Sequence, residues 1–123
     1  MTNPFEDSKH FMKAVGQTTD SWNETQFKLY LNLIDEEHNK ELKEAVENND
    51  KVEILDALVD ILVVTIGAIN SIGADAEGAW NEVMRTNFAK IDPATGLVRR
   101  REDGKVLKPE GWQPPQLDKF IGV

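Results

Sequence analysis

Apolar positions recur every three or four residues over most of the chain as far as Ile91, which predicts helices. The first stretch is residues 4–15, where Pro4 suits a first helical turn and Gly16 suits the position after a helix end. The last stretch follows Asp75 as an N-cap and keeps a regular apolar face. These two stretches are expected to form the first and the last helix.

A long second helix is expected over residues 22–47, with Asp20 or Ser21 as its N-cap. Its apolar stripe consists of Phe27, Tyr30, Leu31 and Ile34. The same spacing then reaches Glu37 and Glu41. Carboxylates therefore occupy positions where the pattern predicts a core.

Residues 51–71 form the most apolar stretch of the chain, and their acids keep a helical spacing. We expect a third helix here, capped by Asp50 and ended by Gly73. Gly67 is expected to permit close approach of a neighbouring helix rather than to break this one. Beyond Asp60 the helix is apolar nearly all round, so both of its sides must be covered. A small monomer offers few ways to do this, which predicts an oligomer.

The helical pattern ends at Asp92, where turn signals, a basic run at 99–101 and a proline-rich stretch at 105–117 follow. The predicted fold class is all-α: an antiparallel helical bundle of about four helices with an irregular Pro-rich C-terminal tail, assembling as an oligomer. We expect residues 1–123 to form a single domain, with 91–123 as its extended C-terminal segment.

Composition narrows the possible functions. The net charge of −8, from 22 acids against 14 Lys and Arg, argues against a general nucleic-acid or membrane-surface binder. The absence of cysteine excludes thiolate metal sites and cysteine nucleophiles. The longest uncharged run, residues 61–74, is shorter than the roughly 20 residues of a membrane span, and residues 1–13 show no signal pattern. A cytoplasmic location is expected.

Two groups of acids lie on the second and third helices, which a short turn makes antiparallel neighbours. The groups are Glu36, Glu37, Glu41 and Glu44 on one helix, and Glu53, Asp56 and Asp60 on the other. Oxygen ligands suit hard cations, so the pattern predicts a Mg²⁺ site that also accepts Mn²⁺. Two or more such ions would hold a polyphosphate and activate water.

A purely structural role for these acids is the alternative. Taken alone, the acids of residues 36–41 are typical of a solvated helix surface. Asp56 and Asp60 lie in an apolar helix, where burial of an unpaired charge is costly, and this favours ligands. A nonfunctional role would pair these two with Arg85 or Lys90.

Several motifs together carry a resemblance to a known superfamily. They are residues 11–17, 33–42 with Ala45, 53–60 with the apolar run and Gly67, 85–90, and 104–115. In order and spacing they resemble the all-α nucleotide pyrophosphohydrolases, the MazG-like and phosphoribosyl-ATP pyrophosphohydrolase-like superfamily of phage and bacterial type. The resemblance implies hydrolysis of a nucleoside triphosphate between the α and β phosphates, which yields a monophosphate and pyrophosphate.

The resemblance also implies Mg²⁺ held by Glu-x-x-Glu on one helix and Glu-x-x-Asp on the next. This chain departs from the first motif, because the third residue after Glu37 is Lys40 and the usable partner is Glu41. A literal Glu-x-x-Glu occurs at Glu41 and Glu44, so two registers remain open.

The second motif also has two registers. Glu53 and Asp56 fit it literally, whereas alignment on the apolar run makes Asp60 the terminal acid and places Ala57 at its partner position. The predicted metal ligands are Glu37, Glu41, Glu53, Asp56 and Asp60.

Catalytic and substrate-binding roles can be assigned to further residues, and the resemblance implies the phosphate contacts among them. Glu36 or Glu37 would orient or deprotonate the attacking water. The positions that resemble phosphate contacts are Asn87, Lys90, Lys105 and Lys108. Trp22 and Phe27 are candidates to stack on the base, although core packing is the commoner role of such aromatics. Helix-end capping is the alternative role for Asn87 and Lys90.

The predicted function is a Mg²⁺-dependent pyrophosphohydrolase that acts on (d)NTPs. Two alternatives remain: a non-catalytic helical interaction module, and a hydrolase of a phosphoribosyl nucleotide. The expected assembly is a homodimer or a dimer-of-dimers tetramer.

Overall fold

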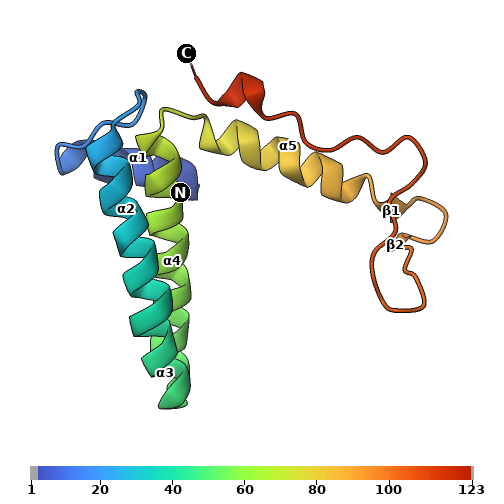
Figure 1. Cartoon of the computed structure of the whole chain (residues 1–123), viewed down its shortest axis with the longest axis horizontal. Coiled ribbons are helices and arrows are strands. Elements are labelled where there is room, and N and C mark those ends of the chain that lie inside the picture. The colour runs from blue at the N-terminus through green and yellow to red at the C-terminus, as the bar shows by residue number, and fades with distance from the viewer. Residues whose placement is uncertain (1–2, 123) are drawn as a thin grey trace. The chain divides into compact units, whose positions relative to one another are not determined.

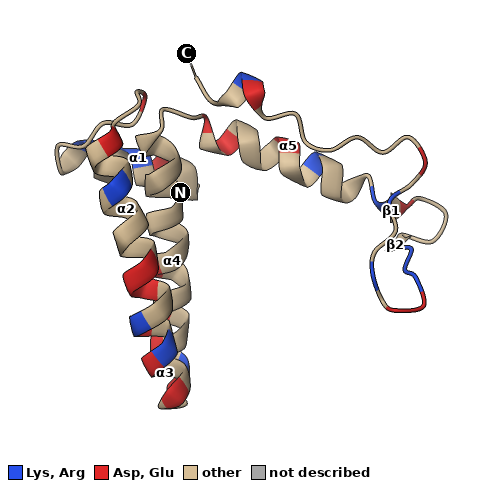
Figure 2. Cartoon of the chain, in the orientation of Figure 1, with Lys and Arg blue, Asp and Glu red and all other residues tan. Residues whose placement is uncertain are grey.

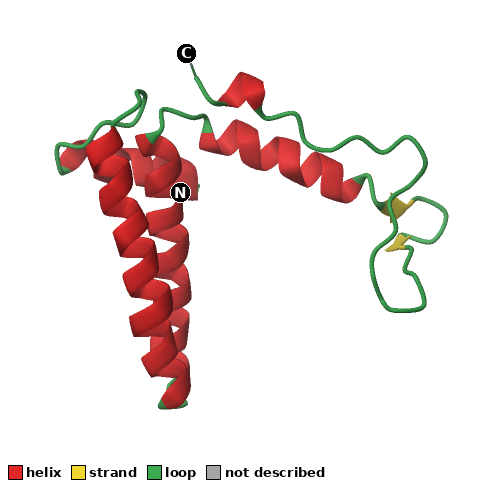
Figure 3. Ribbon diagram, viewed as in Figure 1, coloured by secondary structure: helices red, strands yellow, loops and turns green. Residues whose placement is uncertain are grey.

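The structure of the chain, a computed structural model, describes residues 3–122 and is mostly helical (Figure 3). Its elements are α1 (Pro4–Ala14), α2 (Glu24–Glu36), η1 (Glu37–Leu42), α3 (Lys43–Glu47), α4 (Lys51–Ser71), α5 (Ala76–Phe88), β1 (Ile91–Asp92), β2 (Leu97–Val98) and η2 (Asp118–Phe120). The predicted all-α class is confirmed. The third predicted helix coincides with α4, and the predicted second helix corresponds to three consecutive segments.

The chain divides into two compact units. The first comprises the described residues of Met1–Ala76 and Ile121–Val123, and the second is Glu77–Phe120. Each unit is described by itself below. The single-domain organisation stays a prediction.

In the first unit, α2, η1 and α3 form one continuous helical run that lies antiparallel to α4 (Figure 1). The buried centre consists of Met12, Tyr30 and Ala68, which come from α1, α2 and α4. At Gly67 an added Cβ would lie 2.6 Å from Cδ1 of the Tyr30 ring, well inside van der Waals contact. The prediction that Gly67 permits close approach of a neighbouring helix is therefore confirmed.

The ends of α4 agree with the sequence predictions, whereas the start of α2 and the end of α5 differ. The last helical pattern was predicted to continue to Ile91, but α5 ends at Phe88 and Ile91 is an exposed residue of β1. The Asp50 carboxylate accepts a hydrogen bond from the Glu53 backbone N–H at 3.2 Å, as predicted for an N-cap. The predicted caps of the second helix, Asp20 and Ser21, are wrong. Asn23 is the N-cap, because its side chain accepts from the Gln26 N–H at 3.1 Å.

The displaced helix start has a physical reason. The Trp22 backbone pairs with Ile72 in an isolated bridge, and the Asn23 N–H donates to the Ser71 carbonyl at 2.8 Å. These residues are extended rather than helical because their backbone groups bond to the end of α4. Asp20 instead accepts from Lys9 Nζ at 3.1 Å.

A buried amide fastens the start of α2 to the end of α4. Gln26 is 8% exposed, and its Nε2 donates to Ser71 Oγ and to the Thr18 carbonyl, both at 2.8 Å. Its Oε1 accepts from the Thr18 N–H at 3.0 Å. The amide is thus satisfied on both sides, as a buried polar group requires.

The second unit consists of α5, the hairpin and the following tail. Strands β1 and β2 pair antiparallel, with Ile91 opposite Val98. This two-stranded element was not predicted, since two residues per strand are too short for a period of two to be recognised. The tail is held to α5 where Trp112 Nε1 donates to the Thr86 carbonyl at 2.8 Å. The tail therefore packs on α5 at this point.

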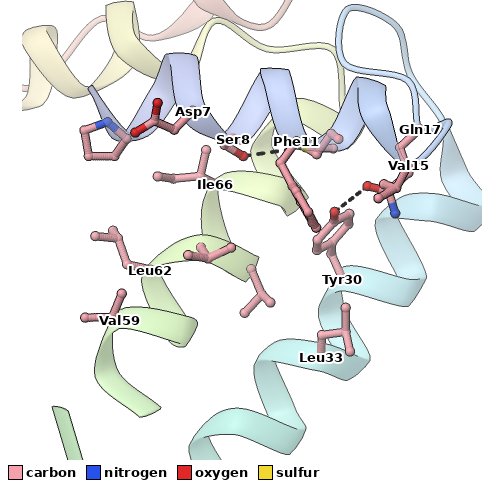
Figure 4. A pocket seen from close by; sticks show the side chains of 14 residues that line it. Asp7, Ser8, Phe11, Val15, Gln17, Tyr30, Leu33, Val59, Leu62 and Ile66 are labelled. Carbon is pink, nitrogen blue, oxygen red and sulfur yellow. Dashed lines mark hydrogen bonds between the residues drawn. The ribbon is translucent and has the colours of Figure 1, made fainter. Parts of the chain in front are cut away.

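The outer side of α4 stays apolar and uncovered in the single chain. Leu55, Leu58, Val59, Leu62 and Val63 are each about half exposed or more. Among residues 3–122, no helix combines the length and apolarity that crossing a membrane requires. A groove of about 620 Å³ opens beside this side of α4, with Phe11, Tyr30, Leu33, Val59 and Leu62 among its walls (Figure 4).

Candidate metal centre

The acids of the second helical run face the first half of α4. Figure 2 shows that acidic positions gather in the second half of the run formed by α2, η1 and α3. The π-helical segment η1, which begins at Glu37, packs directly against α4. No proline or glycine interrupts this part of the run, so its helix continues through the acidic motif.

Glu37 is the centre of the carboxylate group. Its side chain is partly buried, and its pKa is raised above the ordinary value. Desolvation is the largest cause, and the negative charges of Asp60, Glu41, Glu36 and Asp56 follow in that order. Four carboxylates from two neighbouring helices therefore act on Glu37. Each of these five causes raises the pKa.

The other predicted acids lie at the margin of this group. Glu53 is exposed in the first turn of α4, and it is not among the charges that raise the pKa of Glu37. Glu44 is likewise exposed on α3 and absent from those charges. Of the two registers left open by the first motif, the one with Glu37 and Glu41 agrees better with this electrostatic grouping.

The carboxylates suit Mg²⁺ by their chemistry and by their arrangement. Oxygen donors are the ligands that this hard cation prefers, and a shared cation would offset the mutual repulsion at Glu37. Within residues 3–122, no three Asp, Glu, His or Cys side chains already converge closely enough to form a closed metal site. The arrangement is an open set of carboxylates on two helices. Mg²⁺ usually binds in this way, retaining waters and using substrate phosphates.

The predicted structural partners of Asp56 and Asp60 have other roles. Arg85 donates to both carboxylate oxygens of Glu82, at 2.8 and 2.9 Å. Lys90 Nζ donates to Asn87 Oδ1 at 3.2 Å. These contacts lie within the second unit, and the pairing of Arg85 or Lys90 with Asp56 and Asp60 stays an alternative.

Two predicted phosphate-binding lysines lie over one aromatic ring in the second unit. Lys90 Nζ is 5.2 Å and Lys108 Nζ is 4.7 Å from the centroid of the Trp112 ring. Asn87 joins them through its hydrogen bond to Lys90. Lys105 lies in a turn after β2, where its backbone N–H donates to Asp103. Asn87, Lys90 and Lys108 are thus brought together, while no contact joins the Lys105 side chain to them.

The predicted base-stacking aromatics lie away from the carboxylates. Trp22 pairs with Ile72, which is twelve residues beyond Asp60, or about 18 Å along a helix axis. Phe27 packs on the buried centre around Tyr30, and its ring lies 5.7 Å from that of Trp22. Their role in substrate binding stays a prediction.

Two features of the first unit were not predicted from the sequence. One is the π-helical segment; the extra residue between Glu37 and Glu41 was its signal. The other is the polar rim of the apolar groove, where Tyr30 Oη donates to Gln17 Oε1 at 2.5 Å (Figure 4). No sequence pattern marks Gln17, since its partner is thirteen residues away.

Comparison with known proteins agrees with the arrangement of the helices and acids. A family model described as phosphoribosyl-ATP pyrophosphohydrolase matches residues 8–87, more than half of the chain. A search of curated proteins finds no match. The matched region contains every residue of the carboxylate group and extends to Asn87. The chain belongs to the phosphoribosyl-ATP pyrophosphohydrolase family, and is therefore a hydrolase of the class that acts on acid anhydrides.

Proposed function

We propose that this protein hydrolyses (d)NTPs between the α and β phosphates in a Mg²⁺-dependent reaction, giving a (d)NMP and pyrophosphate. The observation that carries the proposal is the group of carboxylates whose charges raise the pKa of Glu37. Repulsion among Glu37, Asp60, Glu41, Glu36 and Asp56 is unfavourable in the absence of a cation. Because the chain belongs to a pyrophosphohydrolase family, binding of Mg²⁺ for catalysis would explain why these carboxylates stand together despite their repulsion.

Glu37, Glu41, Asp56 and Asp60 would hold the Mg²⁺, with Glu53 available from the first turn of α4. When bound, the ion neutralises phosphate charge and lowers the pKa of water. The carboxylates do the positioning, because they extend from two packed helices rather than from loops.

Proton transfer is assigned to the carboxylates that are not fully engaged as ligands. Glu36 or Glu37 would orient the attacking water and accept its proton. The raised pKa of Glu37 brings it closer to neutrality, which favours a general base. Asn87, Lys90 and Lys108 would contact the phosphates through one amide and two ammonium groups, and Lys105 would add a further cation from the turn after β2.

We further propose that the exposed apolar side of α4 is covered by a second copy of the chain, in a homodimer or a dimer of dimers. The half-exposed leucines and valines of this side would lose their contact with water on association. Light scattering coupled to size exclusion tests this directly. A monomer at micromolar concentration would contradict it.

The deciding experiment is a substrate panel with Mg²⁺. Each NTP and dNTP is incubated with the protein, and products are separated by anion exchange. Pyrophosphate and the nucleoside monophosphate are expected. Orthophosphate and the nucleoside diphosphate would contradict cleavage between the α and β phosphates.

A second candidate substrate is phosphoribosyl-ATP, which the description of the matched family favours. It carries the same triphosphate, so the same carboxylates would serve, and the panel includes it. A non-catalytic interaction module predicts no turnover of any compound. Binding of Mg²⁺ with a nonhydrolysable dNTP would exclude that alternative.

A further inference from the structure

The π-helical segment lies at the acidic motif itself. Its six residues, Glu37–Leu42, interrupt an otherwise α-helical run from Glu24 to Glu47. A π-turn within an α-helix accommodates a surplus residue, and such turns are frequent at functional sites. The segment contains neither proline nor glycine, so the usual local causes of helix distortion do not explain it.

An uninterrupted α-helix would not reproduce the burial after Glu37. If Tyr30 defines 0° around the axis, Glu37 falls at about −20° and Glu41 at about 20°, in the middle of the buried side. Leu42 would fall at about 120° and point away from α4. In the structure the burial is reversed: Glu41 is exposed, and Leu42 is partly buried.

If one residue of η1 is left out when the angles are counted from Tyr30, the calculated positions agree with the observed burial. Glu41 then falls at about −80°, Leu42 at about 20° and Ala45 at about −40°. Ala45 is buried at 5% exposure, and Leu42 is the more buried neighbour of Glu41. Leu42 and Ala45 thus stay on the side defined by Tyr30. The segment has absorbed one residue.

We propose that η1 is a one-residue expansion of the helix that positions Glu41. It places Glu41 about 60° from Glu37 around the axis, the offset of two residues three apart in an α-helix. It also keeps Leu42 and Ala45 against α4, so that the acids and the core stay in register. The part of this proposal that concerns the metal rests on the proposed function, whereas the part that concerns the helix does not.

The helix part is tested by two single-residue deletions in the same helical run. Deletion of Lys40 removes the surplus residue, so the run closes to a continuous α-helix with its buried side intact. Deletion of Lys28, also an exposed lysine but in an α-helical stretch, rotates the preceding turn by about 100° relative to the rest of the run. Both variants lose one lysine, so they differ in helical phase rather than in the residue type removed.

Thermal unfolding in EDTA, followed by circular dichroism, compares the two. Deletion of Lys40 is expected to leave Tm within about 3 °C of the unaltered protein or above it, while deletion of Lys28 lowers Tm by about 10 °C or more. A loss on deletion of Lys40 as large as that on deletion of Lys28 would overturn the proposal.

The metal part is tested by calorimetric titration with Mn²⁺. Deletion of Lys40 is expected to keep the dissociation constant within about threefold, because it preserves the offset between Glu37 and Glu41. Glu41→Gln is expected to weaken binding at least about tenfold, both with and without the deletion, because one ligand is lost. A folded Lys40 deletion that binds as weakly as Glu41→Gln would overturn the positioning role.

The two parts fail in distinguishable ways. If the unaltered protein takes up no Mn²⁺, the metal part falls together with the proposed function. The comparison of melting temperatures still decides whether η1 absorbs a residue.

Discussion

Carboxylates in the two units have opposite surroundings. In the second unit, Glu82 accepts two hydrogen bonds from Arg85 and one from the Gln116 N–H, and its pKa is lowered from 4.5 to about 2. In the first unit, the pKa of Glu37 is raised by desolvation and by neighbouring carboxylates. Paired acids hold parts of the chain together. The repulsion within the Glu37 group is what the proposed metal ion would offset.

The largest expected effect is on turnover, and it concerns the carboxylate group around Glu37. Asp60→Asn removes one charge from the group without a change in volume, and should lower turnover at least about a hundredfold under saturating Mg²⁺. Asp20→Asn, whose carboxylate is paired with Lys9, is the matched control. Initial rates of pyrophosphate release measure both. Equal rates would show that the charge at Asp60 is dispensable.

Glu37→Gln should separate stability from metal binding. The raised pKa means that charged Glu37 is disfavoured in the folded state, so its stabilising contribution is present at low pH and is lost as pH rises through the folded pKa. In EDTA at pH 7 the variant should therefore melt about 2 °C higher than the unaltered protein.

The same variant should bind Mn²⁺ more weakly, and its advantage in Tm should vanish at pH 4, where Glu37 of the unaltered protein gains a proton. Melting curves at both pH values provide the check. A variant that melts lower at pH 7 would mean that Glu37 makes favourable contacts which the repulsion does not outweigh.

On the paired side, Glu82→Ala should free the Gln116 part of the tail from α5 without unfolding the helix, while Trp112 keeps its bond to Thr86. The lowered pKa of Glu82 means that its stabilisation is present above pH 4.5 and is lost as pH falls towards about 2. Amide exchange at Gln116 should accelerate roughly tenfold at pH 7, because its acceptor is gone. Unchanged protection would remove Glu82 from this role.

The smallest effect is expected at an exposed pair. Lys28 and Glu24 lie 3.2 Å apart, with about two thirds of each side chain exposed. Such pairs contribute little, so Lys28→Ala should shift Tm by about 1 °C or less. This variant sets the baseline against which the shift in Glu37→Gln is judged.

Helical spacing alone predicted most of the first unit. The bounds of α4, its cap at Asp50 and the close approach at Gly67 follow from residue types whose local preferences agree with the fold. The start of α2 did not follow, because Asn23 becomes the cap through a backbone bond to Ser71, 48 residues along the chain. Contacts at that separation leave no local pattern.

The sequence identified the candidate acids of the site, but it did not show which of them lie together. Acids at core positions on two consecutive helices marked Glu37, Asp56 and Asp60. The sequence alone did not decide between Glu41 and Glu44, or between Asp60 and Glu53, as members of the group. That choice required knowledge of which charges act on Glu37. The surplus residue in η1 explains why spacing alone left the register open.

The most direct test of the unpaired carboxylates is calorimetric titration of Mg²⁺ in the presence of a nonhydrolysable dNTP. The account predicts saturable uptake by the unaltered protein and by Asp20→Asn, and at least a tenfold loss of affinity in Asp60→Asn. No uptake by the unaltered protein, or equal uptake by all three, would contradict it.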